Sequence, residues 1–535
     1  MQAKFVWWKH GVIYHIYPRS FYDSNNDGIG DLQGIIKKLN YLVELGIDAI
    51  WLSPIYESPM IDFGYDVSDF KSISIEYGSI NDFKELIDKA HQFGIKIIMD
   101  LIMNHTSNKH PWFIESSSSL TNSKRDWYIW KESNNNNKPN NWLSAIGKSA
   151  WELDKTTNQY YLHSFFKEQP DLNWRNNEMQ EAFFNDIKYW LNIGVDGFRL
   201  DVVNFIVKDL KFRNNPIFMW INLFQKHIYN RNRPKSYKII KKLRKLVNEH
   251  NDKVLIGEIY VFPPGDSKTA ASYLNNKKGL NLTFDFSLIF KKWGAKSYYK
   301  YLENWYNNIP KKSWPCNVLS NHDLNRAFNR GLFDIKNEEK AKISAVFILT
   351  IKGTPFIYYG DEIGMINGKI KKSEIKDPLG KKYWPFYKGR DKSRTPMQWN
   401  SEYYSGFTCS KPWLPINHDF KEKNVENQKS QEKSILALYI SIIKLRKKYP
   451  SLSMGSFIPL HKGENGIISY YRVYKNEKLF VILNFTNKNK KININSSLKN
   501  ILYSTHREIS TIDSLSKFLV FPYEAIILNS NEAFN

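Results

Sequence analysis

The 535-residue sequence predicts an α/β fold: a (β/α)8 TIM barrel with an inserted loop-rich subdomain after strand 3 and a C-terminal all-β sandwich domain. Two observations support this prediction. Apolar, β-rich segments alternate with segments of helical periodicity along most of the chain, which is the pattern of a parallel sheet with helical crossovers. Three of the predicted strands end in a carboxylate, and the active sites of such barrels lie at the carboxyl ends of the strands.

The three carboxylates are Asp201, Glu258 and Asp323. Asp201 ends the segment 194–201, and Arg199 lies two positions before it, so both side chains would point the same way from a strand. A neighbouring cation favours the ionised form of a carboxyl group. A single acid of this kind is usually a cap or a surface residue, but three of them, with Arg199 and His322 beside them, indicate a catalytic site.

Residues 1–105 are predicted to form the first part of the barrel. We expect strand, helix, strand, helix and strand, in that order, at 12–17, 32–43, 49–52, 83–93 and 96–103. Gly46 and Gly94 mark the ends of the two helices. Residues 106–173 lack this alternation and contain a Ser run, an Asn tract and scattered Trp residues, so we expect an inserted subdomain there.

The alternation resumes over residues 174–453, the predicted second part of the barrel. Helices are expected near 178–192, 235–250, 341–351 and 431–447, and strands at the Asp201 and Glu258 segments, 280–286, 317–323 and 354–359. The last part, 454–535, is predicted to be a small β-sandwich, with β-rich stretches at 467–473, 479–484 and 518–528.

The loop after the first strand is a candidate metal site. Oxygen-bearing side chains recur at Asp23, Asn25, Asp27 and Asp31, and Gly28 allows a sharp turn, as in the first half of an EF-hand loop. A polar turn that caps the next helix through Asp31 explains the same residues. The two interpretations are compatible.

The composition is globular and rich in rings, with 42% hydrophobic residues and 15% aromatic residues. The formal net charge of +24 would permit binding to nucleic acid or to an anionic membrane. Lysine is spread along the chain without a basic motif, so we expect neither partner. The two cysteines, Cys316 and Cys409, allow no disulfide framework. We see no leader segment and no run of 18 apolar residues, and we expect a cytoplasmic protein.

Seven motifs resemble, in order, those of the α-amylase family of glycoside hydrolases (family 13), in its α-glucosidase and oligo-1,6-glucosidase branch. They lie at residues 62–66, 100–105, 169–173, 197–201, 257–258, 321–323 and 394–399. The set is specific and runs along most of the chain, whereas the C-terminal domain matches in type and at Pro522–Ala525.

The resemblance implies a retaining double displacement. Asp201 would be the nucleophile that forms a covalent glucosyl-enzyme, Glu258 the general acid and then the base, and Asp323 the acid that stabilises the transition state. Such a mechanism needs one ionised and one protonated carboxyl group about 5–5.5 Å apart. Arg199 should lower the pKa of Asp201, and burial with neighbouring negative charges should raise the pKa of Glu258.

The resemblance also implies a closed pocket for one terminal glucose. The substrate-binding residues would be Asp62, Tyr65, His105, Phe165, Gln169, Arg199, His322 and Arg390. Tyr65 would stack on the sugar ring, and Asp62 with Arg390 would hold the hydroxyls of the non-reducing end. The two histidines would donate hydrogen bonds to sugar hydroxyls and to developing charge. Phe165 and Gln169 would form a wall of the pocket. Closure of the pocket by Asp62 and Arg390 predicts exo action.

One structural divalent ion, calcium or magnesium, is implied at the loop after the first strand. Asp23, Asn25, Asp27 and Asp31 would supply side-chain oxygens, and Ile29 its backbone carbonyl. No cofactor is implied for the chemistry, and the substrate would be a small α-glucoside.

Linkage and outcome stay open. The residue after the implied nucleophile is Val202. In this branch of the family, Val at that position accompanies acceptance of α-1,6 bonds, whereas other stretches of the sequence resemble general α-glucosidases. A transglucosidase, sucrose isomerase, trehalose synthase or trehalose-6-phosphate hydrolase would use the same acids. The arginine-rich motif of sucrose isomerases is not seen at 324–330, which counts against isomerisation. A non-enzymatic transporter-associated relative is disfavoured because all three acids are present and no N-terminal membrane helix is seen. The oligomeric state is left open.

Overall fold

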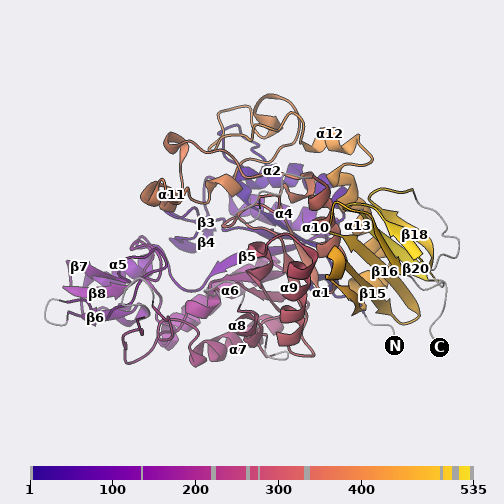
Figure 1. The fold of residues 1–535 in the computed structure, drawn as a ribbon. Coiled ribbons are helices and arrows are strands. Elements are labelled where there is room, and N and C mark those ends of the chain that lie inside the picture. The colour runs from indigo at the N-terminus through magenta and orange to yellow at the C-terminus, as the bar shows by residue number, and fades with distance from the viewer. Residues whose placement is uncertain are drawn as a thin grey trace.

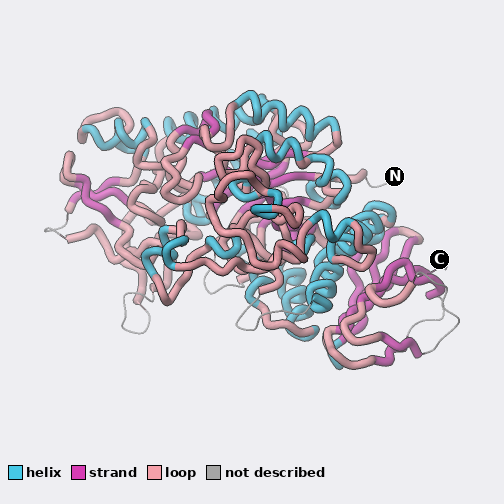
Figure 2. The backbone as a smooth tube through the Cα atoms, turned by 90° about the horizontal axis from the view of Figure 1, so that it is seen from above, coloured by secondary structure: helices cyan, strands magenta, loops and turns pink. Residues whose placement is uncertain are grey.

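The computed structural model describes residues 4–133, 137–217, 225–260, 266–274, 278–329, 338–493, 498–508 and 517–530. A parallel sheet surrounded by helices occupies the middle of the molecule (Figure 1). The small sheet of the segment inserted after the third barrel strand lies at one end, and the C-terminal strands lie at the opposite end. The view from above shows the same arrangement (Figure 2).

Eight parallel strands form one sheet in the order β11-β10-β9-β5-β2-β1-β13-β12. Their bounds are β1 Ile13–Ile16, β2 Ala49–Leu52, β5 Lys96–Ile102, β9 Gly197–Asp201, β10 Val254–Gly257, β11 Leu282–Thr283, β12 Cys316–Val318 and β13 Thr354–Tyr358. The edge strands β11 and β12 approach each other, because the Cys316 thiol donates a hydrogen bond to the Thr283 carbonyl at 3.0 Å. Side chains from both edges also share one buried cluster with Trp51, Val254 and Phe356. The predicted barrel is confirmed.

Two barrel strands are shorter than predicted, and both differences have a local cause. The strand expected at 280–286 is β11 alone, because the Asp285 carboxylate accepts a hydrogen bond from the Ser287 amide at 2.9 Å and the chain turns. The strand expected at 317–323 ends at Val318. The Asn321 side chain accepts hydrogen bonds from the two amides that follow His322, which folds this stretch into a turn.

Helices cover the outside of the sheet. Their bounds are α1 Trp7–His10, α2 Leu32–Lys37, α3 Leu39–Leu45, α4 Ile80–Gln92, α6 Asn177–Ile193, α7 Pro234–Asn248, α8 Ser267–Ser272, α9 Ala295–Asn308, α10 Glu338–Thr350, α11 Pro378–Tyr383, α12 Val425–Lys429, α13 Ile435–Lys448 and α14 Pro450–Met454. The helix predicted at 32–43 is divided at Lys38, whose ψ of 7° leaves the helical region. Gly46 ends α3 in the left-handed conformation with φ 85°, which glycine adopts without strain.

The inserted segment contains more regular structure than predicted. It has a helix, α5 Pro111–Ser118, and an antiparallel sheet of β6 Trp130–Glu132, β8 Gln159–Leu162 and β7 Trp151–Asp154. The strands have three or four residues each, too few for an alternating pattern to be recognised in the sequence. A short hairpin of β3 Tyr56–Glu57 and β4 Asp69–Ile73 precedes it.

The C-terminal part is all-β, as predicted. One sheet has the order β14-β15-β16-β20-β18, and a second pairs β17 with β19. The bounds are β14 Ser456–Lys462, β15 Ile467–Tyr474, β16 Glu477–Asn484, β17 Lys490–Asn493, β18 Leu498–Ser504, β19 Lys517–Val520 and β20 Ala525–Ser530. The β-rich stretch at 518–528 is therefore two strands in two sheets. The buried Glu524 carboxylate accepts a hydrogen bond from the Phe521 amide at 2.7 Å and holds the turn between them.

Candidate active site

The three predicted acids converge on one cavity. Asp201 is the last residue of β9, Glu258 follows β10 directly, and Asp323 lies in the turn after β12. All three line a cavity of about 400 Å³ at the carboxyl ends of these strands. The barrel therefore places the acids where the strand-end pattern predicted them.

The Arg199 guanidinium joins two of these acids. It donates to Asp201 Oδ1 at 2.9 Å and also to Glu258 Oε2. It donates as well to both oxygens of Asp100, at 2.7 and 2.9 Å. Arg199 is 1% exposed, so this cation is shared by three carboxyl groups away from water. Asp100 begins the motif at residues 100–105 but was not among the predicted site residues, because its role depends on contact with β9.

Protonation in this cluster differs in part from the prediction. Burial raises the pKa of Asp201 well above its usual range; Arg199 opposes this rise, and the nearby Glu258 and Asp100 carboxylates add to it. Arg199 acts in the predicted direction, because it lowers the pKa of Asp201, but the net shift of the Asp201 pKa is upward. Burial also raises the pKa of Glu258, as predicted, with Asp323 contributing. Because one guanidinium faces three carboxyl groups, a proton is retained among them more readily than in water.

Asp323 has the opposite environment. Although burial alone would raise its pKa, His322, Arg390 and Arg394 hold it below the usual range. Arg394 Nη2 donates to Asp323 Oδ1 at 2.8 Å, and Arg390 Nη1 lies 3.5 Å from the same oxygen. Arg394 belongs to a quoted motif, but its contact with Asp323 spans 71 residues and no local signal indicated it. Asp323 is thus held ionised beside two carboxyl groups of raised pKa.

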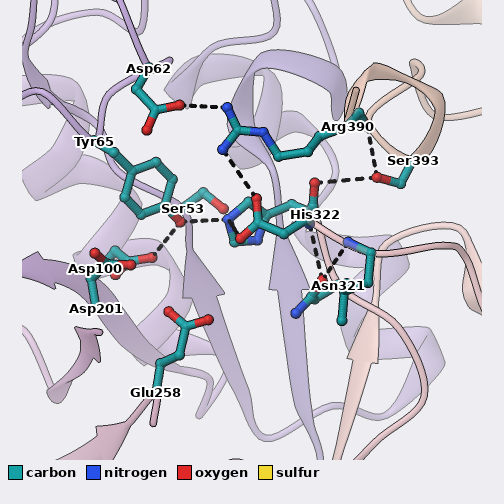
Figure 3. Close-up of polar contacts among 12 residues, drawn as sticks. Ser53, Asp62, Tyr65, Asp100, Asp201, Glu258, Asn321, His322, Arg390 and Ser393 are labelled. Atoms are coloured by element: carbon teal, nitrogen blue, oxygen red, sulfur yellow. Dashed lines mark hydrogen bonds and ion pairs between the residues drawn. The ribbon is translucent and has the colours of Figure 1, made fainter. Parts of the chain in front are cut away.

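An ion pair forms part of the cavity lining. Arg390 Nη2 donates to Asp62 Oδ1 at 2.6 Å (Figure 3). The same nitrogen donates to Asp377 Oδ1 at 2.8 Å. The ring of Tyr65 lies beside this pair, and its hydroxyl donates to Asp100 Oδ2 at 3.1 Å. Asp377 caps the start of α11 and was not found from the sequence, because a buried helix cap and an arginine partner look alike there.

The predicted pocket wall is assembled as well. Gln169 Nε2 lies 3.2 Å from His105 Nε2 and donates to Asp62 Oδ2 at 3.3 Å, and the rings of His105 and Phe165 are 5.3 Å apart. These residues line the cavity with Tyr65 and Arg390. Burial lowers the pKa of His105 to about 4, so the ring is neutral at neutral pH.

Two of the predicted binding residues, Arg199 and His322, lie behind the cavity lining. His322 is 1% exposed, stacks on Tyr65 with ring centroids 5.5 Å apart, and its Nε2 lies 2.7 Å from the Tyr65 hydroxyl. Burial lowers its pKa to about 3. In this geometry His322 orients Tyr65 and Asp323.

Val202 lines the cavity directly after Asp201, with a left-handed backbone of φ 32° and ψ 44°. Such angles are rare for a β-branched residue. The Val203 amide donates to the Glu258 carbonyl at 3.1 Å, which ties this turn to the end of β10. The turn fixes Val202 between the two proposed catalytic residues.

A buried ion pair joins the inserted segment to the barrel. Lys208 Nζ lies 2.8 Å from Asp171 Oδ2 and donates to Asn104 Oδ1 at 2.9 Å. Asp171 also accepts from the Ser164 amide at 2.8 Å. All of these residues are buried, so the lysine joins the end of β5 to the segment that carries Phe165 and Gln169. The sequence prediction missed Lys208.

The opposite half of the cavity is mainly apolar. Its lining consists of Ile259, Tyr260, Ala270, Phe284, Asp285, Phe286, Phe290 and Leu324. The rings of Phe284 and Phe286 stack at 5.3 Å with an interplanar angle of 13°. This half adjoins Glu258, the residue proposed to protonate the leaving group, and it offers rings to a sugar face.

The loop at 23–31 has the predicted oxygen atoms, and hydrogen bonds within the loop already engage them. The Asp23 carboxylate accepts from the amides of Asn26 and Gly28 at 2.7 and 2.8 Å, and Asp31 caps α2 through the Gly34 amide at 2.6 Å. These contacts account for the turn. No group of three or more His, Cys, Asp or Glu in the described parts of the chain is arranged to hold a metal ion.

The fold and the site together define a glycoside hydrolase of the (β/α)8 type. A family model described as "Alpha amylase, catalytic domain" matches residues 15–455, and one described as "Alpha-amylase SusG C-terminal domain" matches residues 467–527. The chain belongs to the α-amylase family.

Individual relatives are similar along nearly the whole chain. An oligo-1,6-glucosidase of Parageobacillus thermoglucosidasius is 38% identical, and the match covers 97% of this chain and 98% of that protein. The structure of an α-glucosyl transfer enzyme, XgtA, matches with a TM-score of 0.91 and 33% identity over 99% of this chain and 100% of that one. An isomaltulose synthase from Protaminobacter rubrum matches with a TM-score of 0.89 and 32% identity over 99% of this chain and 100% of that one. Of the helices that the structure describes, none combines the length and the apolar character needed to cross a membrane.

Proposed function

We propose that this protein is a retaining, exo-acting α-glucosidase that removes terminal α-linked glucose from disaccharides and short oligosaccharides. The observation that carries the proposal is the shared guanidinium of Arg199, which brings the carboxyl groups of Asp201 and Glu258 together in the cavity. Retaining enzymes need two such groups about 5–5.5 Å apart, because one must attack the carbon that the other helps to release. The name of the Parageobacillus relative, an oligo-1,6-glucosidase, agrees with this activity, whereas the two solved structures are named as a transfer enzyme and an isomaltulose synthase.

The two carboxyl groups divide the reaction. Asp201 attacks the anomeric carbon while Glu258 gives its proton to the departing oxygen, so the glycosidic bond breaks as the bond to Asp201 forms. Glu258, now ionised, takes a proton from the water that attacks the same carbon and releases Asp201. The raised pKa of the Asp201–Glu258 pair supports the required state with one proton on the pair.

Exo action follows from the closed end of the cavity. The Asp62–Arg390 ion pair and Gln169 stand where a chain extending beyond the terminal glucose would have to pass. Their polar atoms suit the hydroxyls of a non-reducing end. Asp323, held ionised by Arg394, would accept hydrogen bonds from ring hydroxyls near the reacting carbon.

A panel of maltose, isomaltose, sucrose, trehalose, trehalose 6-phosphate and starch tests the function. We expect glucose from the short sugars and none from starch. New disaccharides with little free glucose would identify a transferase or isomerase instead, and starch breakdown would contradict the closed pocket. The maltose-to-isomaltose rate ratio of a Val202→Thr variant tests the linkage role of Val202. Val202 should favour α-1,6 bonds, so the ratio should rise in the variant.

The sequence stretch 324–330, which was compared with the arginine-rich motif of sucrose isomerases, ends at Arg330, and Arg330 lies outside the described residues.

We also propose a structural calcium or magnesium ion at the loop 23–31. The support is the alternation of Asp23, Asn25, Asp27 and Asp31, which are oxygen donors of the kind these ions prefer. A ligand that binds the folded state raises the melting temperature. Added calcium or magnesium should therefore raise it and a chelator lower it, and Asp27→Asn should reduce the effect. Unchanged melting in all cases would leave only the hydrogen-bonded turn.

The predicted cytoplasmic location and the predicted domain limits are carried forward as proposals. Cell fractionation checks the first. Limited proteolysis, with cuts expected near residues 106, 173 and 454, checks the second.

A further inference from the structure

Arg231 is a nearly buried cation without a polar partner. The side chain is 8% exposed, and among the residues that the structure describes it makes neither a hydrogen bond nor an ion pair. Its guanidinium lies over the rings of Phe205 and Tyr260, 5.3 and 5.9 Å from their centroids. Arg233, two residues later, instead lies 3.2 Å from an oxygen of Asp209. Burial lowers the pKa of Arg231 only to about 10, so the group stays charged at neutral pH.

The position of Arg231 relates it to the leaving group. Tyr260 lines the cavity two residues after Glu258, the proposed proton donor to the leaving group, and Arg231 lies behind that lining, against the Tyr260 ring. The Asn204 side chain donates to the Tyr260 carbonyl at 2.8 Å and to Asn232 Oδ1 at 3.1 Å. The Asn232 amide donates back to the Asn204 carbonyl at 2.8 Å. These bonds fasten the segment that carries Arg231 to the cavity rim at Tyr260.

The rest of this half of the cavity offers no cation to a substrate. Among the described residues that line the whole cavity, Arg390 is the sole basic side chain, and it is engaged at the closed end by Asp62 and Asp377. The carboxylate of Asp285, which also lines the leaving-group half, accepts hydrogen bonds from the Ser287 amide and the Ser267 hydroxyl. Aromatic rings can hold a sugar face there, but recognition of a negative charge falls to Arg231.

A nearly buried guanidinium without an anion is costly, because its donors lose part of their hydration and gain no charged partner in exchange. A phosphate ester offers several charged oxygens that match the guanidinium fork. Resting on the α-glucosidase function proposed above, we propose that Arg231 binds a phosphate monoester on the leaving sugar. The favoured substrate is then an α-glucoside of a sugar phosphate. The phosphate ester stays intact, and the products are glucose and the sugar phosphate.

Inhibition of p-nitrophenyl α-glucoside hydrolysis tests the assignment without depending on linkage. Glucose 6-phosphate should inhibit the wild-type protein competitively, and Arg231→Gln should raise its inhibition constant roughly 10- to 100-fold, the size expected for a hydrogen bond between charged groups. The inhibition constant of glucose should be the same in both proteins. The matched control is Arg233→Gln, which should leave both constants unchanged. Arg231→Lys, which keeps the charge, should recover part of the effect. Melting curves verify that each variant is folded.

Three results would overturn the proposal: no inhibition of the wild-type protein by glucose 6-phosphate, equal inhibition of wild type and Arg231→Gln, or an equal effect of Arg233→Gln. Glucuronate that inhibits as strongly as glucose 6-phosphate would overturn the assignment to phosphate. Loss of the proposed function would look different. In that case p-nitrophenyl α-glucoside would not be hydrolysed at all, whereas failure of the Arg231 role alone leaves its hydrolysis intact.

Discussion

At the scale of single residues, Arg199 is the cation that the proposed catalytic pair shares. It is the one cation in contact with the oxygens of Asp100, Asp201 and Glu258 in the described part of the site. Three acids around one buried cation cannot all be ionised at low cost. This imbalance raises the pKa of the pair that must share a proton, while Asp323, with its own arginines, remains charged.

Glu258→Gln tests the general acid. Loss of the proton donor should lower kcat/KM on maltose by roughly 100-fold or more, the size typical of general acid catalysis, and much less on p-nitrophenyl α-glucoside, whose leaving group departs easily. In wild type, the rate should decline at alkaline pH as Glu258 loses its proton. In Glu258→Gln, assayed on p-nitrophenyl α-glucoside, this decline should be absent. Equal losses on both substrates would assign Glu258 another role.

Asp201→Asn should stabilise the fold while abolishing turnover. Because the pKa of the Asp201–Glu258 pair is raised in the fold, the folded protein holds one proton on this pair that the unfolded chain releases above about pH 4, so wild-type stability falls as pH rises past that point. The variant does not carry this charge. Its melting temperature should therefore exceed that of wild type more at pH 7 than at pH 4. A variant that is less stable at pH 7 would contradict the raised pKa.

At the scale of elements, the strand ends position the acids, and buried arginines join the elements behind them. Arg446 on α13 is 1% exposed and donates to the carbonyls of Leu349, Leu452 and Gly353, at 3.1, 2.9 and 2.6 Å. These carbonyls belong to the end of α10, to α14 and to the approach to β13. One side chain on α13 is thus joined to α10, to α14 and to the segment that leads into barrel strand β13.

Arg446→Gln should lower the free energy of unfolding by about 3 kcal/mol, because buried carbonyls would lose a charged donor. Thermal and urea unfolding measure the change. Lys444→Gln, at an exposed position on the same helix, is the control and should change stability little. Equal unfolding curves for wild type and Arg446→Gln would show that these bonds add nothing.

Sequence patterns predicted the elements that have strong local signals. The strand ends at Asp201 and Glu258 were found because apolar runs, strand period and a terminal acid coincide. The sheet β6-β8-β7 was missed because its strands are too short to show a period. Lys208 was missed because its partners, Asn104 and Asp171, lie about a hundred and nearly forty residues before it in the chain. The roles of such residues depend on contacts between distant parts of the chain, which a local sequence pattern does not show.

At the scale of the whole molecule, the parts of the site come from segments far apart in the sequence. Asp62 and Arg390 are separated by 328 positions, and the ion pair forms because the fold brings the loop between β3 and β4 beside the segment after α11. The closed pocket is therefore a property of the complete fold. Motif resemblance supplied Asp62 and Arg390 as candidates, and only the fold shows that they meet.

Arg390→Gln should open the pocket. Asp62 would lose its charged partner, so KM for maltose should rise. The kcat/KM of longer maltooligosaccharides should increase relative to the kcat/KM of maltose. Lys392→Gln, a change two residues away, is the control. Steady-state kinetics on maltose through maltopentaose measures the effect, and an unchanged chain-length profile would show that the ion pair does not limit substrate length.

Mass spectrometry of a trapped intermediate tests the central claim most directly. Incubation with 5-fluoro-α-glucosyl fluoride, followed by digestion, should yield one peptide that carries a fluoroglucosyl group on Asp201, and Asp201→Asn should yield none. Turnover of the reagent without any adduct, or an adduct on a different carboxyl group, would contradict a retaining mechanism through Asp201.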